Sequence, residues 1–176
     1  MRWPWSAAPA PMLRDAQAQA LLQDLLSGDG GRITDAARTL ARLFDAAPLD
    51  ALAPHAALIE QRSAGIALGG MLVSNQAHLK AALQRLRYWQ AGAGCLCALN
   101  PGYPFFDPRR LIEHGQMQLL SLDAAEDSWG DCHSVACTHC GQHWQAIDRE
   151  YHYPWWEWKT SGRWSRHAWG GSTGPP

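Results

Sequence analysis

The chain has 176 residues, of which 47% are apolar and 18% charged, and this composition excludes an intrinsically disordered protein. Its formal net charge of -1 gives no overall attraction to nucleic acid or to an anionic membrane. No apolar run approaches the roughly 20 residues that a membrane span needs. The first five residues are not followed by the apolar stretch that is typical of a secretory signal. We therefore expect a soluble, cytoplasmic protein.

Residues 1–91 predict a helical region. Apolar side chains recur at helical spacing over 11–26 and 33–46, so each segment has one apolar face. Pro48 suits the first turn of a third helical segment, and Pro54 divides that segment into two short pieces that end near Arg62.

A fourth helix follows Ser74 or Asn75, because either side chain can accept hydrogen bonds from the first amides of a helix. Its apolar side is formed by five residues at helical spacing: Leu79, Ala82, Leu83, Leu86 and Trp89. Such leucine-rich faces are typical of a packed core rather than of a ligand groove.

The composition changes after residue 91, where residues 92–169 become rich in Cys, Trp, Tyr, Pro and Gly. Strands are expected over 116–122, 132–137, 142–149 and 151–159, with an acidic connector at 123–130 and a tight turn at 138–141. We predict an α+β protein with a helical N-terminal part and a small antiparallel sheet. Residues 170–176 are expected to form a disordered tail.

All five cysteines lie within 95–140, in a chain with no export signal, and this pattern favours metal binding over a disulfide framework. Cys137 and Cys140 stand three positions apart before Gly141, as in a zinc knuckle. Cys95 and Cys97 would share one face of a strand. We therefore predict that these four thiolates hold a Zn²⁺ ion that links the C-terminal strands.

Two other interpretations of these cysteines compete with zinc binding. Buried free cysteines pack well as small apolar side chains. A redox C-x-x-C would stand between a strand and a helix, whereas a strand is expected after Gly141. Cys132 is left over as a core residue, and four nearby histidines are expected to pack or lie at the surface rather than bind metal: His133, His139, His143 and His152.

A zinc ion with four cysteine ligands has no open position for water, which indicates a structural role. The sequence also lacks the metalloprotease, deaminase, P-loop and nucleophile-elbow motifs. We therefore predict that the protein is not an enzyme.

Six tryptophans fall within residues 144–169. At least half are expected to belong to the core, where they close the sheet or pack it against the helices, and the others would form a protein-binding surface with neighbouring acids. The residues assigned to that surface are Glu150, Trp155, Trp156, Glu157 and Trp158. Residues 95–159 carry nine acidic and four basic side chains, a balance of -5, whereas a nucleic-acid track must be basic. A zinc-ribbon adaptor in transcription or RNA metabolism is the alternative, and the charge disfavours it.

The pattern C-x-x-C-G-x-x-W at residues 137–144, with R-E-Y-H-Y-P-W-W-E-W-K at 149–159 and an upstream C-x-C, resembles small bacterial immunity proteins. The resemblance covers residues 74–159. It implies a binding protein without catalytic activity that neutralises a cognate toxin. A basic nuclease toxin would fit an acidic protein that imitates the charge of the nuclease's substrate.

Overall fold

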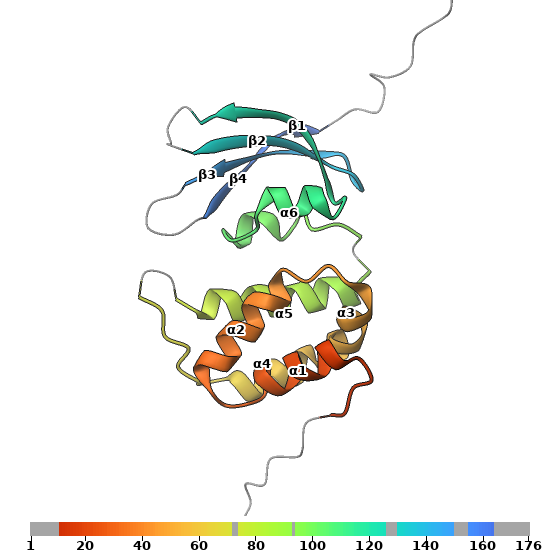
Figure 1. Ribbon diagram of the computed structural model, residues 1–176, viewed down its shortest axis with the longest axis vertical. Coiled ribbons are helices and arrows are strands. Elements are labelled where there is room, and N and C mark those ends of the chain that lie inside the picture. Colours follow the sequence, from red (N-terminus) through yellow and green to blue (C-terminus); the bar gives the residue numbers. More distant parts are fainter. Residues whose placement is uncertain (1–10, 72–73, 93, 126–129, 150–154, 164–176) are drawn as a thin grey trace, which may run out of the picture. The chain divides into compact units, whose positions relative to one another are not determined.

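The computed structural model describes residues 11–71, 74–92, 94–125, 130–149 and 155–163. The chain forms two compact units, residues 1–93 and 94–176. The first unit contains helices and the second a four-stranded antiparallel sheet, so the protein is α+β, as the sequence predicts (Figure 1). The expected tail at 170–176 lies outside the described residues.

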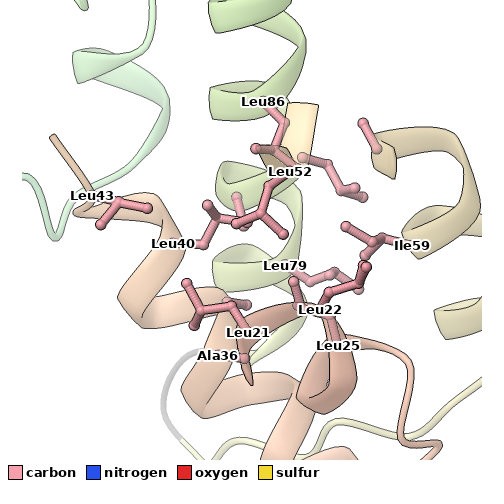
Figure 2. Packing of buried hydrophobic residues seen from close by; sticks show 14 of the residues in the cluster. Leu21, Leu22, Leu25, Ala36, Leu40, Leu43, Leu52, Ile59, Leu79 and Leu86 are labelled. Atoms are coloured by element: carbon pink, nitrogen blue, oxygen red, sulfur yellow. The ribbon is translucent and has the colours of Figure 1, made fainter. Parts of the chain in front are cut away.

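The first unit is built from helices that share one apolar core. These are α1 (Ala16–Leu25), α2 (Gly30–Ala41), α3 (Ala46–Leu52), the short 3-10 helix η1 (Ala53–His55), α4 (Ala56–Ser63) and α5 (Gln76–Gln90). Leucines from α1, α2, α3 and α5 point toward one another together with Ile59 of α4 (Figure 2). None of the described helices is long and apolar enough to cross a bilayer.

Aspartate caps move two helix boundaries away from the positions predicted by periodicity. The Asp15 carboxylate accepts a hydrogen bond from the Ala18 amide at 2.7 Å, so α1 begins at Ala16 rather than near residue 11. Asp29 accepts from the Arg32 amide at 2.8 Å, which starts α2 at Gly30, three residues before the predicted position. Both contacts satisfy amides that have no partner inside the helix.

The start of α5 uses both of the residues predicted to cap it, but in different ways. The Ser74 hydroxyl accepts a hydrogen bond from the Gln76 amide at 3.3 Å. Asn75 occupies the cap position without a capping bond from its side chain. Its side-chain amide donates instead to the Leu68 carbonyl at 2.8 Å, which ties the preceding loop to the helix.

In the second unit the strands pair in chain order as an antiparallel meander. They are β1 (Met117–Ala124), β2 (Asp131–Cys137), β3 (Gln142–Asp148) and β4 (Trp156–Arg163). The register of β1 on β2 is interrupted by a bulge at Leu120, because Leu119 pairs with Val135 and Ser121 with Ser134. The predicted fourth strand was placed too early: β4 extends to Arg163, and residues 151–154 lie outside the described part of the chain.

One face of this sheet is covered by residues that precede it in the chain. A 3-10 turn, η2 (Asn100–Gly102), and the short helix α6 (Pro108–Glu113) come before β1, and α6 was not predicted. The Trp158 indole donates to the Phe106 carbonyl at 3.2 Å, and the Trp156 amide donates to the Pro104 carbonyl at 2.6 Å. These bonds attach β4 to the segment that covers the sheet. We call the covered side the inner face.

His133 of β2 is a buried histidine on the inner face, with its ring 5.3 Å from that of Trp156. Burial lowers its pKa, and four charged groups have smaller effects on it: Asp131 of the same strand, and Asp107, Arg109 and Asp148 from neighbouring segments. As pH falls below about 6.5, the unfolded chain takes up a proton at this position before the folded chain does. We therefore expect stability to decrease with falling pH in this range.

The His133→Phe variant should lose that part of the pH dependence. The slope of unfolding free energy against pH, measured in urea between about pH 5 and 7, should be smaller by at most about 1.4 kcal/mol per pH unit. Metal content is followed in the same samples, since acid also releases metal from thiolates. Equal slopes in the two proteins would show that His133 does not titrate between the folded and unfolded states.

Candidate metal centre

Four cysteines from two distant segments come together in the second unit. The sulfurs of Cys95, Cys97, Cys137 and Cys140 all lie within 4.8 Å of one another, and those of Cys97 and Cys140 are 3.6 Å apart. A tetrahedral site with metal–sulfur bonds of about 2.3 Å places its sulfurs about 3.8 Å apart. All four thiols are free of disulfides. The group is therefore spaced to hold one metal ion, and it contains the same four residues that the sequence predicts.

The second pair of ligands stands on the tight turn between β2 and β3. Cys137 ends β2, and the Gly141 amide donates to its carbonyl at 2.9 Å. Gly141 has a φ of +70°, a conformation that glycine adopts at little cost. The Thr138 hydroxyl donates to the Gly115 carbonyl at 2.8 Å and so attaches the turn to the chain before β1. This half of the site has the predicted knuckle conformation.

The first pair of ligands differs from its predicted conformation. Cys95 and Cys97 were expected on a strand, but they stand on a bend that leads into η2. The Leu99 and Asn100 amides both donate to the Leu96 carbonyl, at 2.8 and 3.2 Å, and this closes the turn. A strand would hold side chains two residues apart at about 6.5 Å, too far for neighbouring ligands of one ion. The bend brings the two sulfurs closer than a strand allows.

A contact between Gly94 and His139 joins the two halves of the site. A Cβ atom at Gly94 would lie 2.4 Å from Nε2 of His139, so a larger residue there would displace the imidazole from this position. The φ of Gly94 is +76°, which also favours glycine. His139 thus packs beside the first pair of ligands and is not among the four that converge. Sequence reasoning missed this contact, because no local pattern links two residues 45 positions apart.

N–H donors surround the sulfurs. The Trp144 indole donates to Cys97 at 3.3 Å, the Cys97 amide to Cys95, and the Gln142 amide to Cys140. Such donors spread the negative charge of a four-thiolate site. The role of Trp144 was not predicted, because the sequence alone does not show that its ring points toward Cys97.

Burial has the largest effect on the acidity of these thiols. It raises the pKa of Cys97, which is only 8% exposed, and it raises the pKa of Cys95. Burial also acts to raise the pKa of the exposed Cys140, but the Gln142 amide and neighbouring thiols donate to that sulfur and bring its pKa below the ordinary value. A divalent cation would offset the cost of burying several thiolates together.

The fifth cysteine lies apart from this group. Cys132 is half-buried on β2, and its neighbours in the strand, Asp131 and His133, point to the other side of the sheet. Burial and the nearby Asp123 carboxylate raise its pKa. Among the described residues, the cluster that can hold a metal includes neither Cys132 nor a histidine. His152 lies outside the described part of the chain.

The surface predicted for partner binding requires a correction. Trp156 and Trp158 are only 4% and 8% exposed, and the Trp158 ring packs edge-on against Trp144 with ring centres 6.1 Å apart. Both rings therefore belong to the core of the second unit and are not available to a partner. They were misplaced because Pro154 obscured the alternation that would have shown which face each side chain occupies.

The remaining residues of that predicted surface have mixed positions. Trp155 and Glu157 are half-buried, and Glu150 lies outside the described residues. Glu157 bonds to Arg149 at 2.7 Å and to Lys159 at 3.2 Å, and the hydrogen bond from Arg149 lowers its pKa. Its charge is thus already engaged within the sheet.

Comparisons with protein families, with characterised proteins and with solved structures find no match to this chain. Four cysteines can fill all four positions of a tetrahedral ion, which leaves no position for substrate or water.

Proposed function

We propose that the four-cysteine group holds a zinc ion with a structural role. Four sulfur ligands in tetrahedral spacing suit zinc or iron, and zinc is the usual ion in knuckles of this kind. Its task is to hold the segment that begins at Gly94 against the turn between β2 and β3. The second unit is small and covers its sheet with only short helical segments, so a metal link contributes stability that its core alone would not supply.

We further propose that the chain is a non-enzymatic immunity protein that binds and neutralises a cognate bacterial toxin in the cytoplasm. The observation that carries this proposal is the charge of the sheet. Residues 111–148 include β1, β2 and β3 and contain six acidic side chains but no lysine or arginine. An acidic protein surface fits a basic partner, and a nuclease toxin must be basic where it holds its nucleic acid.

The same charge argues against the alternative zinc-ribbon adaptor that binds nucleic acid. Protein side chains that neutralise phosphates are lysines and arginines, and these are missing from the first three strands. Asp123 and Asp131 are both exposed there. Phosphate groups would meet repulsion at this surface.

The proposal is tested by co-expression with the product of the neighbouring gene in the native genome. A toxin encoded there should stop growth when expressed alone, and this chain should restore growth and form a complex with the toxin. The double variant Asp123→Lys/Asp131→Lys should protect less well. Asp35→Lys/Asp45→Lys is the matched control, because it makes the same change in charge at two exposed carboxylates of the first unit.

Two results would contradict the proposal. One is full protection by the charge-reversed variant, since the acidic sheet would then have no part in neutralisation. The other is a neighbouring gene whose product is harmless, together with salt-dependent binding of this chain to DNA or RNA in a shift assay.

A further inference from the structure

The two edges of the sheet differ in how they are protected. β4 carries the half-buried Glu157 and the exposed Lys159, and charged side chains, lysine above all, discourage another strand from pairing with an edge. β1 instead exposes three leucines, Leu119 at 43%, Leu120 at 45% and Leu122 at 54%. Among the described residues no strand pairs with its outer side. β1 is thus an apolar edge with unpaired backbone groups.

The register shows that these leucines continue the inner face. Leu119 pairs with Val135 and Leu122 with His133, and both of these β2 residues are buried on the inner face. Residues directly opposite in an antiparallel pair project to the same side. The buried face of the sheet therefore extends to β1 and remains uncovered there. A further strand would bury Leu119 and Leu122 as the next row of that face.

The outer face of β1 has the opposite character. Asp123 is exposed and pairs with Cys132, whose side chain lies on the outer face. A strand that paired with β1 would therefore meet leucines on one side and the Asp123 carboxylate on the other.

We propose that β1 is a docking edge for an extended, basic segment of a partner protein, which adds to the sheet as a fifth strand. Alternation along that strand would place apolar side chains beside Leu119 and Leu122 and a lysine or arginine beside Asp123. This inference rests on the proposed function, in which the second unit binds a basic protein. A second copy of this chain fits less well, because residues 111–148 offer no cation to pair with Asp123.

The experiment uses the full chain and a labelled peptide of alternating lysine and valine with the eight-residue length of β1. Fluorescence anisotropy should show that the lysine peptide binds and that a matching peptide of alternating glutamate and valine does not. Hydrogen exchange should slow at amides 117–124 in the complex, because backbone pairing protects them. Added salt should weaken the binding.

The Leu119→Lys/Leu122→Lys double variant should weaken binding about tenfold or more, since it replaces the apolar row with like charge. Met12→Lys/Met71→Lys is the control, because it adds the same two charges at exposed apolar positions in the first unit. If the double variant does not bind metal, or if its circular dichroism spectrum shows that it is unfolded, Leu122→Lys alone is used.

The proposal would be overturned if the lysine peptide failed to bind or if protection appeared outside β1. It would also be overturned if sedimentation showed a dimer of the wild-type protein that the Leu119→Lys/Leu122→Lys variant does not form, since β1 would then pair with a second copy. This test needs no toxin. Protection against a toxin without peptide binding would therefore refute the docking edge alone, whereas peptide binding without protection would refute the immunity function alone.

Discussion

Replacing Cys97 with serine is expected to abolish stoichiometric metal binding and to unfold the second unit. Cys97 is buried, stands 3.6 Å from the Cys140 sulfur and receives the Trp144 indole N–H. Binding of structural zinc supplies about 10–16 kcal/mol in small zinc peptides, which exceeds the stability of most small domains. Loss of one ligand should therefore outweigh what the inner-face core contributes.

The measurements are elemental analysis of freshly purified, reduced protein and hydrogen exchange along the chain. In the variant, amides of β1 to β4 should exchange rapidly, while those of α1, α2 and α5 should remain protected because the first unit has its own core. A strong chelator should have the same effect on the wild-type protein. Elemental analysis also distinguishes zinc from iron.

Cys132→Ser is the matched control. It makes the same chemical change at a half-buried cysteine that does not belong to the cluster, so metal content and exchange should stay close to wild type. A Cys97→Ser protein that kept one metal ion per chain, or a wild-type protein that bound none, would contradict the proposed structural zinc.

The sequence predicts the ligands of this site because each pair is local. Two cysteines three residues apart before Gly141 form a recognisable turn, and a second pair without another partner must reach the same ion. The contacts between the two halves of the metal site could not be predicted from the sequence. The packing of His139 against Gly94 and the Trp144 bond to Cys97 join residues more than 40 positions apart, and no local pattern encodes them.

The fold shows the same division between local and long-range information. Helices with several turns, such as α5, were predicted from periodicity, whereas α6 has only six residues and too few turns to show a period. A local signal for α6 was present and was missed. Asp107 accepts the Arg109 amide as an N-cap, and Pro108 follows at the first helical position.

Truncating Trp158 to alanine is expected to destabilise the second unit by about 3–5 kcal/mol, the usual cost of removing a large aromatic ring from a core. Its ring is 8% exposed, packs against Trp144 and donates to the Phe106 carbonyl. Because Trp144 in turn donates to Cys97, loss of its neighbour should also loosen a hydrogen bond to the metal site. We expect metal affinity to fall about 10-fold or more, as measured by competition with a coloured chelator.

Trp155→Ala provides the comparison, because Trp155 is half-buried and lies three residues earlier in the chain. It should cost about 1 kcal/mol or less in urea unfolding and leave metal affinity unchanged. The two variants thus separate a ring that holds the sheet together from one that can still meet a partner. Weaker toxin binding by a stably folded, metal-loaded Trp155→Ala protein would place Trp155 in the interface. Equal destabilisation by both variants would show that Trp155 also belongs to the core. The acidic sheet and the β1 edge would then be the remaining surfaces for binding a partner.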